Sequence, residues 1–221
     1  MAQTLFTARA GGHSQGAYSS LNLADHVGDE PETVAANRKI LGELVSQNAL
    51  AFMEQVHGDT VVKVGAKTIF PVVSDALITN EPGFGLVVMA ADCLPILISG
   101  ENMVGAIHAG RKGVLNGIIA KTVNAMKSEG AGDLTATIGP AICRDCYEVS
   151  QEMYLEAISI IPELATSAVT HKLDLLSAAK AQLQKLGVQV LTTNICTAEN
   201  VNYFSYRRDG QTGRNAGVIV L

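Results

Sequence analysis

The sequence has no tryptophan, only four cysteines and no apolar run long enough to cross a bilayer. A membrane-spanning helix needs about 20 consecutive apolar residues, so we expect no membrane partner. The opening residues, MAQTLFTARAGG, reach glycine after one strand's length and do not form a charged-then-apolar leader. Without a secretory signal, four cysteines in 221 residues are too few for a disulfide framework. We therefore expect a cytoplasmic protein with reduced thiols.

Positive charge is also scarce. The formal net charge is −5 and the basic residues do not gather into a stripe, so we expect no nucleic-acid partner. Hydrophobic residues make up 48% of the chain and charged residues 17%, which is the composition of a packed globular protein rather than a disordered one. Because a chain of 221 residues can bury one substantial core, residues 1–221 are predicted to form a single domain.

The segment 85–113 contains three short apolar runs, at 86–90, 95–99 and 103–107. Each run has strand length, carries β-branched residues and is bounded by glycine or polar residues, which predicts buried strands. Cys93 and His108 lie at the ends of these strands. Side chains at strand ends can converge on one rim of a sheet, so we expect the chemistry of the protein here.

The remaining pattern alternates strands with amphipathic helices. Glycine-aspartate at 58–59, between two apolar runs, predicts a hairpin whose first strand ends at His57. The fold class predicted is α/β (α+β), a single domain of mixed β-sheets with flanking helices. Helices are expected at 31–45, 113–129, 150–161 and 174–186, and further strands at 5–8, 74–80, 134–138, 169–173, 188–191 and 217–221.

Three soft or imidazole ligands lie at predicted strand ends: His57, Cys93 and His108. Two histidines and one cysteine, with a fourth position open, are the pattern of catalytic rather than structural zinc. A thiolate also favours zinc over hard cations. Copper is the alternative metal, with Met89 or Met103 as a weak axial ligand. A trinuclear copper cluster would demand many more imidazoles than His13, His26 and His171 supply.

Basic residues near the predicted site suggest an anion. Arg111 and Lys112 lie between glycines in a strand-to-helix turn, where free backbone N–H groups and positive charge can meet phosphate. Arg207 follows interleaved aromatics, which could stack a base, although an edge strand with a charged turn explains that pattern as well. Asp92 and Glu54 are either proton-transfer groups or solvated residues.

Cys143 and Cys146 form a CxxC pair, which is typical of half a zinc site or of a redox pair. A Cys₄ site would need a second pair, and beyond Cys93 the chain has only Cys196. We therefore favour small, partly buried structural thiols.

Seven blocks in one order resemble the laccase-domain family, whose members are described as polyphenol oxidoreductases and also as purine nucleoside phosphorylases. The blocks are FTARAGGHSQGAYSSLNLADHVGD, QVHGDTV, SDALIT, MAADCLPILI, AIHAGRKG, IGPAICRDCYEV and FSYRRDGQTGR. The resemblance implies a single-domain fold with a catalytic metal, zinc, bound by His57, Cys93 and His108. It also implies phosphorolysis of adenosine, inosine, guanosine or methylthioadenosine, with adenosine deaminase as a companion activity. The expected partners are a purine nucleoside and inorganic phosphate.

The sequence departs from the family where the usual block is HAGWRG. Arg111 replaces the tryptophan and Lys112 replaces the arginine. Lysine supplies a point charge where arginine binds an oxyanion through two parallel hydrogen bonds. Two other functions remain open at this stage: a copper-dependent polyphenol oxidase and a non-catalytic, metal-binding regulatory protein.

Overall fold

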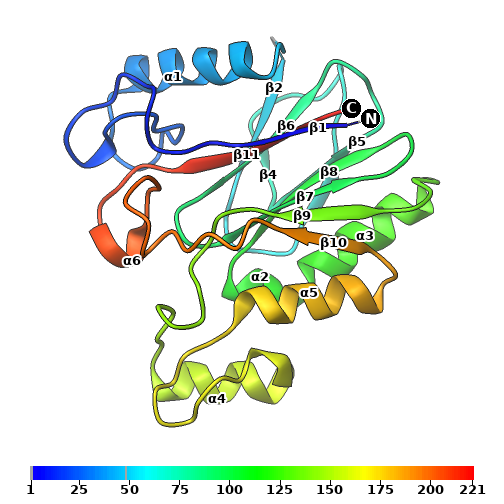
Figure 1. Cartoon of the computed structure of the whole chain (residues 1–221). Coiled ribbons are helices and arrows are strands. Elements are labelled where there is room, and N and C mark those ends of the chain that lie inside the picture. The colour runs from blue at the N-terminus through cyan, green and yellow to red at the C-terminus, as the bar shows by residue number, and fades with distance from the viewer. Residues whose placement is uncertain (1, 48) are drawn as a thin grey trace.

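The computed structural model describes residues 2–47 and 49–221, and its core is a pair of stacked β-sheets with helices on the outer faces (Figure 1). The first sheet has the order β1 (Gln3–Phe6), β11 (Asn215–Val220), β6 (Gly85–Ala90), β2 (Leu50–Glu54) and β4 (Val72–Val73). The second has the order β10 (Gln189–Thr192), β9 (Thr135–Ile138), β7 (Leu94–Ser99), β8 (Val104–Ala109), β5 (Ala76–Thr79) and β3 (Val61–Lys63). Both sheets mix parallel and antiparallel pairs.

Helices cover the outer faces of both sheets. Helix α1 (Pro31–Leu44) packs on the first sheet, whereas α2 (Arg111–Asn116), α3 (Ile118–Ser128) and α5 (Leu175–Lys185) lie on the second (Figure 1). Helix α4 (Gln151–Ile160) lies at the end far from α1, and α6 (Tyr206–Asp209) is one short turn. Two 3₁₀ turns are Gly16–Tyr18 and Pro162–Leu164. The protein is thus a single α+β domain, and among its described residues no helix is long and apolar enough to span a membrane.

Burial on both faces explains why the central strands are continuously apolar. In β6, Val87 and Met89 face α1 and pack in the cluster that contains Leu41, while Leu86 and Val88 face the second sheet. Alternate side chains of a strand point to opposite faces, so a strand covered on both sides needs apolar residues at every position. The strands expected at 86–90, 95–99 and 103–107 are confirmed as β6, β7 and β8.

The hairpin predicted around Gly58-Asp59 is wrong. Strand β2 pairs in parallel with β6 in the first sheet, whereas β3 pairs in parallel with β5 in the second. Residues 55–60 therefore cross from one sheet to the other. From β2 to β7 the chain changes sheet at every connection, and two of these crossings, after β2 and after β6, lead from the first sheet to the second near the candidate site. Because β2 and β6 are parallel neighbours, these two crossings leave the first sheet at the same edge.

Two other predictions differ from the structure in detail. The helix expected at 113–129 begins at Arg111 and is divided at Gly117, whose φ of 82° is the left-handed conformation that ends α2. The strand expected at 169–173 is a turn, with only an isolated bridge between Ala165 and Leu173. The other three expected helices are confirmed, and the remaining expected strands are found with shifts of one or two residues at their ends.

Candidate functional site

The two crossings and strand β8 bring His57, Cys93 and His108 together. Their ligand atoms all lie within 4.8 Å of one another, and the Cys93 Sγ is 3.9 Å from the His57 Nε2. The two imidazole rings meet edge to face, with centroids 4.6 Å apart. His108 is buried, Cys93 is partly buried and His57 is exposed, so the group lies between the core and solvent.

The donor set fits a zinc ion. Zn–S bonds of about 2.3 Å and Zn–N bonds of about 2.0–2.1 Å put tetrahedral sulfur and nitrogen ligands about 3.6 Å apart. The Cys93 to His57 separation of 3.9 Å is close to that value. Three ligands from the described residues leave a coordination position for water or substrate, as in catalytic zinc sites.

A buried carboxylate, Asp75, binds the backbone at His57 and the imidazole ring of His108. It accepts backbone N–H bonds from Val56, His57 and Gly58 at 3.3, 3.0 and 2.6 Å, which holds the left-handed conformation of His57 at φ 59°. The His108 Nδ1 lies 2.8 Å from the Asp75 Oδ1. Since a carboxylate only accepts, Nδ1 carries the proton and Nε2 is free for a metal.

Electrostatics in this group favour a thiolate. Burial raises the pKa of the Cys93 thiol, but the charge and hydrogen bonds of His108 and His57 outweigh it and lower the pKa to about 6. Burial lowers the pKa of His108, but the Cys93 thiolate and Asp75 raise it to about 9. Burial also acts against ionisation of Asp75, yet hydrogen bonds from His108 and the backbone bring its pKa below the usual value. A metal ion bound here would displace one proton, that on the Nε2 of the His108 imidazolium, because the Cys93 thiolate has none to lose.

Position 110 needs a glycine because Cys93 and His57 lie too close to its backbone for a side chain to fit, and not because of its φ angle. A Cβ at this position would lie 2.9 Å from the Cys93 Sγ and 3.2 Å from the His57 Cδ2. The glycine that precedes Arg111 in the sequence therefore leaves room for the ligands, in addition to starting α2.

The three side chains line a cavity of about 510 Å³ whose walls are rich in cations. This volume lies in the range typical of small-molecule sites, roughly 300–1,000 Å³. Asp92 is the single carboxylate among the described residues of the lining. The cations of the wall are Arg111, Lys112, Arg207 and Arg214. The cavity is therefore suited to an anionic ligand.

Asp92, on the cavity wall, is held by three hydrogen bonds. Its carboxylate accepts from the Thr197 hydroxyl at 2.6 Å, the Ser205 hydroxyl at 2.7 Å and the Arg207 backbone N–H at 2.6 Å. These bonds hold Asp92 at φ 101°, a conformation that costs energy for a residue with a Cβ. Glu54, the other acidic candidate, is exposed and lines a neighbouring cavity instead.

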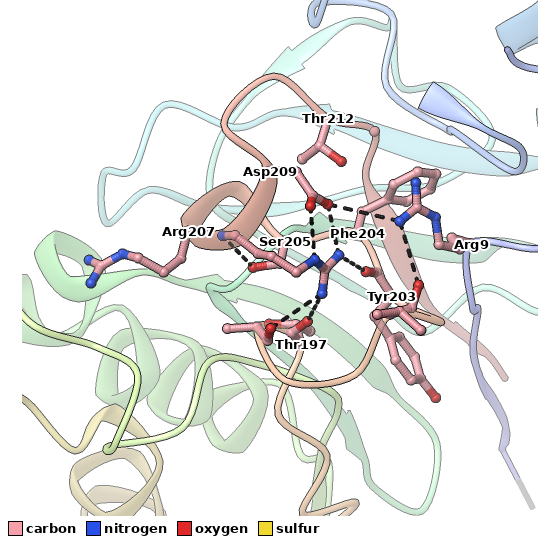
Figure 2. Close-up of polar contacts among 12 residues, drawn as sticks. Arg9, Thr197, Tyr203, Phe204, Ser205, Arg207, Asp209 and Thr212 are labelled. Carbon is pink, nitrogen blue, oxygen red and sulfur yellow. Dashed lines mark hydrogen bonds and ion pairs between the residues drawn. The ribbon is translucent and has the colours of Figure 1, made fainter. Parts of the chain in front are cut away.

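Arg9, Ser205 and Asp209 belong to a cluster of hydrogen bonds and ion pairs around the start of α6, which we call the α6 cluster (Figure 2). In this cluster, Arg9 and Asp209 approach to 3.9 Å, and Ser205 caps α6. Arg207 points away from the α6 cluster, donates to the Cys146 carbonyl at 3.0 Å and lies 5.4 Å from the Tyr147 ring centre (Figure 2). The pattern of aromatics here is not an edge strand.

Phe204 is fully buried and cannot stack on a ligand, whereas Tyr206 is exposed on the cavity wall. Of the two methionines considered as copper ligands, Met103 is fully buried in the core, while Met89 lines the cavity. The Gln55 side chain fixes that wall, since it donates to the Met89 carbonyl at 2.7 Å and accepts from the Met89 N–H at 2.8 Å.

Sequence reasoning missed Asp75, Tyr147 and Arg214. Asp75 precedes a buried strand and is the one acidic residue in the SDALIT block, which was its only signal. Tyr147 directly follows the CxxC pair, and Arg214 follows the last glycine turn. Neither position differs in type from an ordinary loop residue, so only the fold reveals them.

Comparisons with known proteins show the family of this chain. The profile of the multi-copper polyphenol oxidoreductase laccase family matches residues 3–221. A protein of Corynebacterium glutamicum named purine nucleoside phosphorylase is 40% identical, over 98% of this chain and 93% of its own. The Escherichia coli purine nucleoside phosphorylase YfiH is 36% identical, over 96% of this chain and 91% of its own.

A solved structure has the same fold. Neisseria meningitidis protein NMB0706 superposes with a TM-score of 0.91 at 38% identity, over 100% of this chain and 94% of the other. The resemblance seen in the sequence blocks is thereby confirmed. The chain belongs to the multi-copper polyphenol oxidoreductase laccase family, which includes proteins named purine nucleoside phosphorylase.

Proposed function

We propose that residues 1–221 form one catalytic domain, a zinc-dependent purine nucleoside phosphorylase. Its substrates are adenosine, inosine, guanosine or methylthioadenosine together with inorganic phosphate. The observation that carries this proposal is the juxtaposition of His57, Cys93 and His108 with a cation-lined cavity of ligand size. The names of relatives at 36–41% identity support the same reaction class.

We assign His57, Cys93 and His108 as the zinc ligands and thus as catalytic residues. Asp75 positions His108 and the backbone at His57. When bound, zinc supplies Lewis acidity that polarises an oxyanion or lowers the pKa of a water molecule toward about 7. The soft thiolate with two imidazoles favours zinc over hard cations, which accept oxygen ligands.

Arg111, Lys112 and Arg207 would position phosphate. In phosphorolysis, a phosphate oxygen forms a bond to the ribose C1′ while the bond from C1′ to the base nitrogen breaks, and the base takes the electron pair and a proton. Holding the two reactants in one cavity lowers the entropic cost of their encounter. Arg111 is held by Glu156 at 3.1 Å, and Arg207 by the Cys146 carbonyl, so both are preorganised.

Adenosine deamination is proposed as a companion activity of the same cavity. Water adds its oxygen at C6 of the purine, and the amino group leaves as ammonia after gaining a proton. Tyr147 lines the cavity. Burial raises its pKa above the usual value, so Tyr147 stays protonated and can donate a hydrogen bond to the purine.

The deciding experiment measures base release from adenosine and inosine by the zinc-loaded protein, with and without phosphate. We expect release that depends on phosphate and produces ribose 1-phosphate, with inosine appearing from adenosine in its absence. Cys93→Ala should lose both activities together with the zinc ion bound by His57, Cys93 and His108. Base release at an unchanged rate in the Cys93→Ala protein would exclude this site.

A matched pair of lysine variants tests the phosphate role. Lys112→Ala should raise the KM for phosphate about tenfold, which corresponds to about 1.4 kcal/mol. Lys180→Ala, an exposed lysine on α5 outside the cavity, should leave that KM unchanged. Equal effects of the two substitutions would rule out a local role for Lys112.

A copper-dependent polyphenol oxidase is the second candidate, because Met89 lines the cavity beside a His₂Cys group, as in blue-copper sites. Metal analysis separates the two. Stoichiometric copper with phenol oxidation and no base release would favour the oxidase and contradict the phosphorylase.

A further inference from the structure

A second group of metal-binding side chains lies outside the candidate active site. It consists of Cys143, Cys146, Cys196 and Glu199, whose ligand atoms all lie within 4.8 Å of one another. All three cysteines are free thiols. The group shares no residue with the His57, Cys93 and His108 cluster.

The fold explains how distant segments meet here. Strands β9 and β10 are parallel neighbours, so their carboxyl ends deliver the following loops to one edge of the sheet. Pairing continues past the strands as a bridge between Ala141 and Cys196, and the Thr197 N–H donates to the Ala141 carbonyl at 3.0 Å. The single cysteine of one loop is thereby fixed against the CxxC pair of the other.

We propose that Cys143, Cys146, Cys196 and Glu199 bind a second, structural zinc ion. Three thiolates and one carboxylate make a closed set of four zinc-binding ligands, structural zinc is almost always four-coordinate, and a CxxC pair is a usual spacing of two of its ligands. Structural sites differ from catalytic ones in having no open position. The second group has four donors, whereas the first has three.

The distances agree with tetrahedral coordination. Zn–S bonds of about 2.3 Å and Zn–O bonds of about 2.0–2.2 Å place ligand atoms about 3.5–3.8 Å apart. The Glu199 Oε1 lies 3.4 Å from the Cys146 Sγ and 3.8 Å from the Cys143 Sγ. The three cysteines are partly buried and Glu199 is exposed, so the ion can enter from solvent.

Surrounding donors support a negatively charged ligand set. The Cys143 backbone N–H donates to the Cys196 Sγ at 3.3 Å. The Arg208 guanidinium lies against the same loop, where it donates to the carbonyls of Thr197 and Asn200 at 2.7 and 3.2 Å. Hydrogen bonds to ligand atoms and fixed neighbouring charge are the outer contacts that orient metal ligands.

The second zinc would hold one wall of the cation-lined cavity. Ile142 and Tyr147, on either side of the CxxC pair, line the cavity, and the Cys146 carbonyl holds Arg207. The Ile142 N–H donates to the Asp92 carbonyl at 2.9 Å. Joining these two loops through a metal therefore fixes the positions of Tyr147 and Arg207.

Metal content of the full-length protein, purified under reducing conditions with zinc supplied, tests this proposal without reference to activity. We expect about two zinc ions per chain in the wild type and about one in each of the Cys196→Ser and Cys93→Ala proteins. Substitution with Co²⁺ should give thiolate charge-transfer bands that lose most of their intensity in Cys196→Ser. A wild type with a single metal ion that Cys93→Ala removes would overturn the proposal, as would a disulfide among these cysteines in the freshly purified protein.

A milder variant covers the case in which Cys196→Ser fails to fold. Glu199→Gln should release one zinc to a chelator at least tenfold faster than the wild type, since a charged oxygen ligand becomes a neutral one. Hydrogen exchange at residues 141–147 should rise in parallel. Glu152→Gln, an exposed glutamate on α4, is the control and should match the wild type. Zinc release from Glu199→Gln at the wild-type rate would contradict the proposal.

Discussion

One buried carboxylate organises the candidate active site at the scale of single residues. Asp75 is fully buried and binds His108 and three backbone N–H groups. Asp75→Asn keeps the size of the side chain but removes its negative charge. Because all partners of Asp75 are N–H donors, the NH₂ group of the asparagine would face one of these donors without forming a hydrogen bond. We expect zinc affinity at the His57 cluster to fall about 10- to 100-fold, as measured by chelator competition. The free energy of unfolding should fall by about 1–3 kcal/mol.

The matched control for Asp75→Asn is Asp59→Asn. Asp59 lies in the crossing segment 55–60, whose backbone Asp75 binds, but it is partly exposed and forms an ion pair with Lys121 at the surface. We expect no more than about 1 kcal/mol from this change and an unaltered zinc affinity. Zinc affinity that survives Asp75→Asn unchanged would show that His108 does not need its carboxylate partner.

The Cys93 thiol gives a pH-dependent signal in the metal-free protein. Its pKa is lowered from 9.0 to about 6, and only the thiolate reacts with iodoacetamide. Alkylation should therefore rise with pH around a midpoint near 6 and reach a plateau by neutral pH. Peptide mapping assigns the label to Cys93 rather than to Cys143 or Cys146, whose pKa values are raised mainly by burial. A midpoint for Cys93 near that of an ordinary thiol would contradict the pairing with His108, and added zinc should block the reaction.

The sequence singles out the three proposed ligands but not the carboxylate beside them. His57, Cys93 and His108 belong to residue types that bind metals and occur near strand ends, so side-chain chemistry alone selects them. Asp75 differs from other acidic residues only through its burial and its contact with His108, which depend on the tertiary fold. The metal-binding potential of Cys143 and Cys146 is likewise hidden, because Cys196 is a distant single cysteine and Glu199 an ordinary loop carboxylate.

At the scale of elements, Arg208 holds the segment that presents Arg207. The Arg208 guanidinium donates to carbonyls of the 197–203 loop and forms an ion pair with Asp209, in the α6 cluster drawn in Figure 2. Arg208→Lys keeps the charge but loses the planar fork that serves several acceptors at once. We expect a loss of about 1–2 kcal/mol in the free energy of unfolding and faster hydrogen exchange at 197–209, measured by mass spectrometry.

The control for Arg208→Lys is Arg144→Lys, because Arg144 has 62% of its side chain exposed and pairs only with its neighbour Asp145 among the described residues. That protein should exchange like the wild type. If Arg208→Lys leaves exchange at 197–209 unchanged, the loop is held by its other contacts instead.

Most helices and strands could be predicted because their signals are local. Ser150 and Asp174 cap α4 and α5 through side-chain hydrogen bonds, and the apolar periodicity of α5 matches its buried face. The failed hairpin shows the limit of such signals. A sequence of two strands around a glycine turn looks the same whether the strands pair with each other or join different sheets. Which of the two happens depends on the distant strands β6 and β5, with which β2 and β3 pair.

At the scale of the whole molecule, the net charge does not reveal the positive electrostatic field inside the cavity. The formal net charge of −5 gives no sign of a cation-lined cavity. The fold produces the cavity by bringing Arg111 and Lys112 at the start of α2 beside Arg207 in α6 and Arg214 before β11. Such a local field can only be recognised once segments about a hundred residues apart are placed side by side.

This local field predicts that ionic strength controls capture of phosphate by the proposed phosphorylase. Lining cations attract a dianion, and salt screens that attraction over about 10 Å at 0.1 M. We expect kcat/KM for phosphate to fall as potassium chloride is raised, with kcat at saturating phosphate unchanged. Lys112→Ala should start lower and depend less steeply on salt, so that its values approach the wild type at high salt, whereas Lys180→Ala should follow the wild type throughout. A wild-type kcat/KM that is insensitive to salt would mean that the cations of the wall do not act on phosphate in this way.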